Sequence, residues 1–115
     1  MRPSVTIDTE TMEWSSGLEG LSAGVMVKVL STDEETGARA LIGKLPAGYL
    51  ETKHSHPCGC DVLVLQGKLI NTETGQEASK GMFAHIPKGE LHGPFQVSKD
   101  EDYIFFVVTD GPFSN

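Results

Sequence analysis

Clusters of glycine, proline, asparagine and aspartate interrupt this sequence about every 8 to 12 residues, and this spacing limits what the chain can fold into. The runs between the clusters are short and rich in β-branched and aromatic residues, as in "GVMVKVL" at 24–30 and "YIFFVVT" at 103–109. No segment keeps apolar residues at the i, i+3, i+4 and i+7 spacing of a surface helix. The pattern predicts an all-β fold.

The predicted strands lie at 4–8 with an extension over 12–14, then at 24–30, 38–45, 50–56, 61–67 with a continuation to 71, 81–87, 91–97 and 103–109. About nine or ten short strands in 115 residues are typical of one β-sandwich or barrel. The segment 72–77 is predicted to be a turn, and the largely apolar run 61–67 a strand buried on both faces. We find no linker or repeat, so we expect a single domain over residues 1–115.

The charge of the chain limits its partners. The formal net charge is −7, and a surface of that sign repels phosphate backbones and anionic membranes, so we expect neither nucleic acid nor a membrane as partner. No apolar run approaches the roughly 20 residues of a membrane helix. The first ten residues, "MRPSVTIDTE", lack the apolar region of a signal peptide. We therefore expect a cytoplasmic protein.

The segment "KHSHPCGCD" at 53–61 concentrates residues that bind transition metals. His54 and His56 are two apart, so on a strand their side chains point to the same face. Cys58 and Cys60 are the only cysteines, and a disulfide between positions i and i+2 has unfavourable geometry. They are therefore predicted to be free thiols or metal ligands.

Two spaced motifs surround these residues. The first runs from Gly48 through "HSH" at 54–56 to Gly67, and the second from Gly81 through Pro87, Gly89 and His92 to Gln96. The sequence here resembles the cupins, whose motifs are G(x)5HxH(x)3,4E(x)6G and G(x)5PxG(x)2H(x)3N. The resemblance covers 48–67 and 81–96 and implies a jelly-roll β-barrel. It also implies that His54, His56 and His92 bind one metal ion. The glycines at 48, 67, 81 and 89 fall where turns require positive φ.

The chain departs from the motif at the glutamate. Cys60 occupies that position when three residues follow His56, and Asp61 when four do. The ligand set is therefore three histidines with Cys60, three histidines with Asp61, or three histidines alone; we assign Cys60 as the fourth ligand. Cys58 is either a small residue in a turn or a thiol beside the metal. His85 is predicted not to be a ligand.

The resemblance also implies a function. The expected cofactor is a divalent transition metal, iron or zinc, with manganese or nickel as alternatives. The cavity beside it is expected to be lined by Tyr49, Met82, Phe83, Phe95, Phe105 and Phe106, with Lys44, Lys53 and Gln66 as candidate anchors for an anionic substrate.

Two classes of function remain open. The chain looks like cupins related to diketone-cleaving iron dioxygenases, and also like the zinc-binding domain of anti-sigma factors. The first class is a mononuclear iron oxygenase acting on a small molecule. The second is a zinc- or ligand-binding sensing module without turnover, and a metal-dependent isomerase or lyase is a further alternative. A homodimer is expected, because cupins often dimerise through edge strands.

Overall fold

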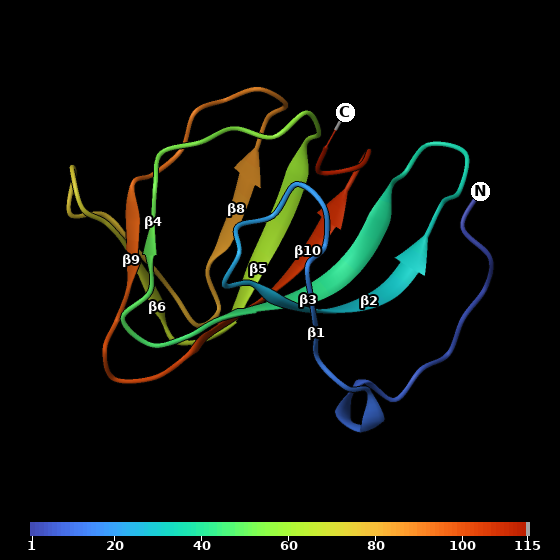
Figure 1. Cartoon of the computed structure of the whole chain (residues 1–115), viewed down its shortest axis with the longest axis horizontal. Coiled ribbons are helices and arrows are strands. Elements are labelled where there is room, and N and C mark those ends of the chain that lie inside the picture. The colour runs from blue at the N-terminus through green and yellow to red at the C-terminus, as the bar shows by residue number, and fades with distance from the viewer. Residues whose placement is uncertain (115) are drawn as a thin grey trace.

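The computed structural model describes residues 1–114, which form two antiparallel sheets that face each other (Figure 1). The larger sheet has the strand order β1 (Ser15–Ser16), β2 (Met26–Thr32), β3 (Arg39–Leu45), β10 (Tyr103–Thr109), β5 (Cys60–Gln66) and β8 (Phe83–Ile86). The smaller sheet has the order β4 (Leu50–Glu51), β9 (Phe95–Val97), β6 (Lys68–Asn71) and β7 (Glu77–Ser79). A short 3-10 turn, η1 (Thr9–Thr11), precedes β1. The predicted all-β jelly roll is confirmed.

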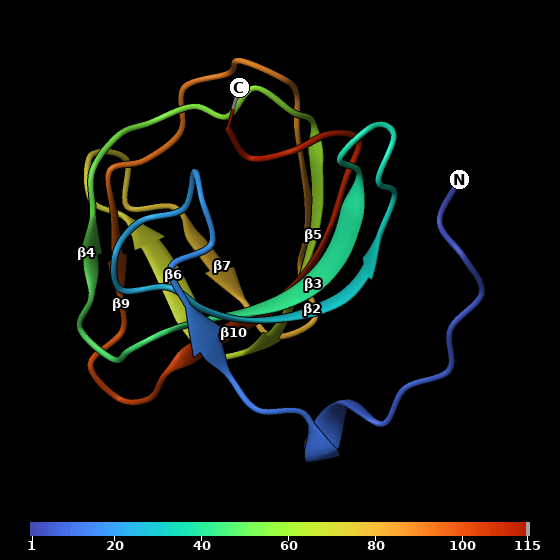
Figure 2. The same cartoon turned by 45° about the vertical axis from the view of Figure 1, so that its right-hand side comes forward.

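The turned view shows the two sheets curving around a common interior, with the connections 52–59 and 87–94 together at one end (Figure 2). Strand β10 is central in the larger sheet, since it pairs with β3 on one side and β5 on the other. In the part of the chain that the model describes, no helix is long and apolar enough to cross a membrane.

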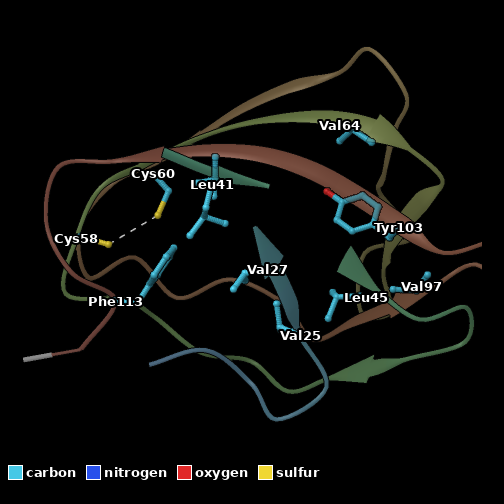
Figure 3. Close-up of a cluster of buried hydrophobic side chains, with 11 residues drawn as sticks. Val25, Val27, Leu41, Leu45, Cys58, Cys60, Val64, Val97, Tyr103 and Phe113 are labelled. Carbon is cyan, nitrogen blue, oxygen red and sulfur yellow. Dashed lines mark hydrogen bonds between the residues drawn. The ribbon is translucent and has the colours of Figure 1, made fainter. Parts of the chain in front are cut away.

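The core lies between the sheets. Its buried side chains are Val25, Val27, Leu41, Leu45, Cys58, Cys60, Val64, Val97, Tyr103, Val107 and Phe113. Figure 3 shows Cys58 and Cys60 beside Phe113 at one end of this cluster, with Tyr103 and Val97 at the other. Neither cysteine forms a disulfide, in agreement with the prediction.

Glycines with positive φ form the turns that bring the two motifs together. Gly48, Gly67, Gly81 and Gly89 have φ values of 78°, 81°, 88° and 78°, which confirms the prediction for these positions. At Gly67, between β5 and β6, a Cβ atom would lie 2.5 Å from the Asp102 carbonyl oxygen. Only glycine fits this turn without displacing the strand beside it.

Several strand predictions were wrong. Residues 4–8 and 12–14 form no strand, and Val5 and Ile7 are 52% and 42% exposed. Their alternation is that of a strand, but no neighbouring strand supplies hydrogen bonds. The segment 50–56 is a strand only at β4, and β7 begins at the end of the predicted turn 72–77.

Strand β5 is also not buried on both faces. Its burial alternates, with Val64 buried but Leu63 and Leu65 each 39% exposed. The larger sheet therefore covers the core with one face only, which is common in antiparallel sheets.

Candidate metal centre

Two connections meet where the three motif histidines lie. His54 and His92 form an isolated antiparallel bridge, with N–O distances of 3.0 Å and 2.8 Å in the two directions. The Gly89 N–H donates to the His56 carbonyl oxygen at 2.9 Å and joins the same two segments again. One ligand atom from each of His54, His56 and His92 lies within 4.8 Å of the other two. Residues about forty positions apart thus converge at one point through main-chain hydrogen bonds.

Backbone carbonyls orient two of the rings. His54 Nδ1 lies 2.6 Å from the Thr52 carbonyl oxygen, and His92 Nδ1 lies 3.3 Å from the Glu90 carbonyl oxygen. A carbonyl oxygen only accepts, so each Nδ1 donates its hydrogen. Nε2 is then the nitrogen left for a metal ion, and a backbone carbonyl at the other nitrogen is the usual environment of a metal-binding histidine.

The electrostatics differ among the three rings. Burial first, and the positive charges of His54 and His92 next, lower the pKa of His56 to about 4. Burial also lowers the pKa of His92. The pKa of His54 is instead raised, chiefly by its hydrogen bond to Glu51, although burial opposes this. His56 and His92 are therefore neutral at pH 7, which is the form that binds metal.

Glu51 was missed by the sequence analysis. Its Oε1 lies 2.9 Å from His54 Nε2, and its side chain is only 15% exposed. In the sequence it stands three residues before the "HSH" run, so a carboxylate close to a histidine pair was the available signal. Phe113 was also missed as a site residue, and its ring centroid lies 5.2 Å from that of His56 in an edge-on contact.

The two candidates for the fourth ligand occupy different places. Cys60 is buried in the cavity wall, where its Sγ lies 3.9 Å from Cys58 Sγ, and it is not part of the 4.8 Å histidine group. Burial first, and the neighbouring Cys58 next, raises the pKa of Cys60 to about 12. Asp61 is exposed on the other face of β5, where its Oδ1 lies 2.7 Å from His85 Nδ1. The structure thus brings three of the four predicted ligands together, and Cys60 as a ligand stays a prediction.

A cavity of about 500 Å³ adjoins the histidines. Its wall includes the three histidines, Glu51 and Cys60, but most of its lining is apolar. Four of the six predicted lining residues are present, namely Met82, Phe83, Phe95 and Phe105, whereas Tyr49 and Phe106 are not among them.

The predicted anion anchors are mostly engaged elsewhere. Lys53 does line the cavity, but its Nζ lies 3.1 Å from Glu73. Lys44 stacks over the Trp14 ring, and Gln66 donates to the Asp102 carbonyl oxygen. The cavity is therefore suited to a small and largely apolar ligand.

The donor set fits a divalent transition metal. Zinc and iron bind neutral imidazole nitrogens, and zinc–nitrogen bonds are about 2.0–2.1 Å. Two nitrogens on one ion are thus about 3 to 4 Å apart, so rings with ligand atoms within 4.8 Å need only small movements.

The chain was compared with known protein families and structures. A family model described as the ChrR cupin-like domain matches residues 2–114. A search of the curated proteins gave no match.

Among solved structures, one similar structure is Rhodobacter sphaeroides SigE in complex with the anti-sigma ChrR. It is 26% identical, with 90% of this chain and 52% of that chain covered and a TM-score of 0.67. An acetylacetone dioxygenase from Acinetobacter johnsonii is 22% identical, with 96% and 74% covered and a TM-score of 0.69. A cupin-like protein of unknown function from Ralstonia eutropha is 21% identical, with 95% and 73% covered and a TM-score of 0.77.

Proposed function

The chain belongs to the ChrR cupin-like domain family, and on that premise we propose that it is a mononuclear metal enzyme of the iron oxygenase type. In this proposal His54, His56 and His92 hold a divalent metal ion, iron in first place. The substrate is a small, largely apolar organic molecule that has two oxygen atoms able to chelate the ion.

The position of the histidines at the wall of the cavity carries the proposal. Three imidazoles meet beside about 500 Å³ of mostly apolar space. A metal that serves only to hold loops together needs no such space, whereas a metal that acts on a bound molecule does. The similarity to an acetylacetone dioxygenase fold agrees with this reading.

The chain's own residues have separate tasks in such a reaction. The Thr52 and Glu90 carbonyls hold the His54 and His92 rings so that Nε2 faces the ion. The buried Phe113 ring packs edge-on against His56 and would hold that ring in place. When bound, ferrous iron would act as a Lewis acid toward a chelating substrate and would supply the redox chemistry that activates dioxygen. The apolar wall orients the substrate by its shape.

A second candidate is a zinc- or ligand-binding module without turnover. The family model itself favours it, because it is described by an anti-sigma factor's cupin-like domain, and so does the similarity to the structure that contains the anti-sigma ChrR. In that case the site is closed by protein ligands and does no chemistry.

Metal analysis combined with oxygen uptake tests the proposal. The protein is purified without a tag, its metals are measured by mass spectrometry, and the iron-loaded form is assayed for oxygen consumption with acetylacetone and related β-diketones. We expect uptake that is lost in His92→Ala and kept in His85→Ala, since His85 lies outside the histidine group. Zinc as the bound metal, with no uptake after iron loading, overturns the enzyme proposal in favour of the second candidate.

A further inference from the structure

We propose that Glu51 binds the same metal ion as His54, His56 and His92 and is the carboxylate ligand of the centre. This inference rests on the proposed metal site and adds a residue that the motif spacing does not contain. The motif carries its glutamate after the histidine pair, at the place where this chain has Cys60. Cys60 is in β5 of the larger sheet, whereas Glu51 ends β4 of the smaller sheet.

The first argument is the spacing between two atoms. Glu51 Oε1 lies 2.9 Å from His54 Nε2, the nitrogen that faces the ion because Nδ1 is held by the Thr52 carbonyl. Two donor atoms about 2.1 Å from one ion and at a right angle to each other are about 3.0 Å apart. Oε1 and Nε2 therefore already have the separation of neighbouring ligands, and an ion bound to both would lie to one side of the line that joins them, in place of the hydrogen bond.

The second argument is where the strand directs this carboxylate. In β4, Leu50 is 69% exposed, whereas the next side chain, Glu51, faces the cavity. The backbone of Glu51 is fixed by its pairing with Phe95 in β9. A carboxylate turned toward a mostly apolar interior is unfavourable unless a cation or hydrogen-bond donor satisfies it. In the structure His54 Nε2 is such a donor, and a divalent ion among the histidines would supply a stronger partner.

The third argument is that the two residues at the motif's own carboxylate position, Cys60 and Asp61, are engaged elsewhere. Asp61 contacts His85 on the outer face, and the Cys60 thiol contacts Cys58. The Glu51 oxygens are not part of the 4.8 Å histidine group, so the carboxylate reaches the ion by rotating about its side-chain bonds. Within residues 1–114, Glu51 is the carboxylate that the ion pairs place on one of the three histidines.

A consequence links this ligand to the two candidate functions. With three histidines and one carboxylate, a tetrahedral zinc ion has all four positions filled, which is the mark of a structural site. A six-coordinate iron ion with the same four ligands keeps two positions free, enough for a chelating substrate or for one substrate atom and dioxygen. The identity of the metal then decides whether the site is closed or open.

The test uses zinc affinity and the cobalt(II) spectrum of the full chain. Zinc affinity is measured by competition with a chromophoric chelator, for the wild type, Glu51→Gln and the control Asp61→Asn. Asp61→Asn is a matched control because it removes a carboxylate that contacts a histidine on the opposite face of β5. We expect Glu51→Gln to bind zinc about 100-fold more weakly, with altered cobalt d–d bands, and Asp61→Asn to match the wild type. Glu51→Asp, which keeps the charge, is expected to have a zinc affinity between those of the wild type and Glu51→Gln. It replaces Glu51→Gln in the comparison if that variant does not fold.

If the wild type binds metal, three results would overturn the assignment of Glu51 as a ligand and leave the proposed function standing. One is a Glu51→Gln variant with unchanged zinc affinity. Another is weaker binding with an unchanged cobalt spectrum, which makes Glu51 a positioning residue that acts through His54. The last is a thiolate-to-cobalt charge-transfer band that disappears in Cys60→Ser, which makes Cys60 the ligand. A wild type that binds neither zinc, iron nor cobalt instead overturns the proposed function itself.

Discussion

The Cys60 thiol lies in the wall of the cavity, close to Cys58 and out of contact with bulk water. Burial first, and the neighbouring Cys58 next, raises its pKa to about 12, so the thiolate is much scarcer at neutral pH than in an exposed cysteine. The thiolate is the reactive form, and a raised pKa therefore slows any reaction at sulfur.

We predict that Cys60 in the folded protein resists alkylation by iodoacetamide at about pH 7 and that its rate rises steadily as the pH is raised toward 12. Intact-protein and peptide mass spectrometry measure the modification. In denaturant both cysteines are expected to react quickly, which is the control for reagent quality. Complete modification of Cys60 within minutes in the folded protein at neutral pH contradicts the prediction.

The Leu41 side chain is fully buried between the sheets. We predict that Leu41→Ala lowers the free energy of unfolding by about 2–5 kcal/mol, because it removes buried methyl groups and leaves a cavity. Leu50→Ala is the matched control, and with 69% of the residue exposed it is expected to change stability by less than about 0.5 kcal/mol. Urea unfolding of the metal-free protein measures both, and equal values for the two variants contradict the prediction.

At the scale of the elements, the turns between strands decide whether the two motifs meet. Gly67 and Gly75 have almost the same φ, 81° and 77°, but different surroundings. A Cβ at Gly67 meets the Asp102 carbonyl oxygen at 2.5 Å, whereas a Cβ at Gly75 has nothing within 4 Å. Comparing alanine variants at the two glycines therefore separates two contributions to the free energy of unfolding: the cost of a left-handed backbone at a non-glycine residue, and the cost of a steric clash.

We predict that Gly75→Ala destabilises the protein by about 1–2 kcal/mol, the cost of a left-handed alanine. Gly67→Ala is expected to cost more, because Tyr103 and its neighbours in β10 must also shift. Thermal or urea unfolding of both variants measures the difference. A smaller loss in Gly67→Ala than in Gly75→Ala shows that the turn after β5 relaxes freely.

The sequence predicted those features of the fold and the site that depend on local spacing, and it missed those that depend on contacts between segments. The motif spacing located His54, His56 and His92, because positive-φ glycines fix the turns on either side of them. The sequence shows a carboxylate close to the histidine pair, but the contact of Glu51 with His54 does not follow from it, since residues three apart on a continuous strand point to opposite faces. The chain bends at Lys53, and only that bend brings both side chains into one cavity. Residues 4–8 show that alternation alone does not reveal whether a strand has a partner.

At the scale of the whole molecule, the proposed metal centre joins two segments that are far apart in the sequence, 51–56 and His92. An ion that binds only the folded chain stabilises it, by about 2.7 kcal/mol at a free concentration of 100 times Kd.

We predict that loading with zinc or iron raises Tm by several degrees and that a chelator reverses the rise. Differential scanning calorimetry measures it, with His92→Ala expected to lose the rise and His85→Ala to keep it. An equal rise in all three proteins indicates that metal binds elsewhere.

The association of whole chains stays a prediction. One edge of the larger sheet is β8, whose Phe83 pairs with Leu63 of β5. Phe83 is 65% exposed and Leu63 is 39% exposed. Exposed apolar residues beside an open strand edge favour association with another copy.

We predict a homodimer in solution, which size-exclusion chromatography with light scattering detects as twice the chain mass of 12.4 kDa. Phe83→Glu is expected to shift it toward the monomer. A single 12.4 kDa species at all concentrations rules the dimer out.

The rings of His54 and His92 are aimed by the carbonyl oxygens of Thr52 and Glu90, which belong to the main chain and not to the side chains. Every amino acid has the same main-chain carbonyl, so a substitution at these two positions leaves the hydrogen bonds that orient the rings in place. Other side chains at positions 52 and 90 would therefore keep these two ring contacts, although the charge of Glu90 also acts on the pKa of His92. We expect a map of mutational tolerance to mark the histidines and the turn glycines as sensitive, and to show no such sensitivity at the two positions whose carbonyls orient the rings of the proposed site.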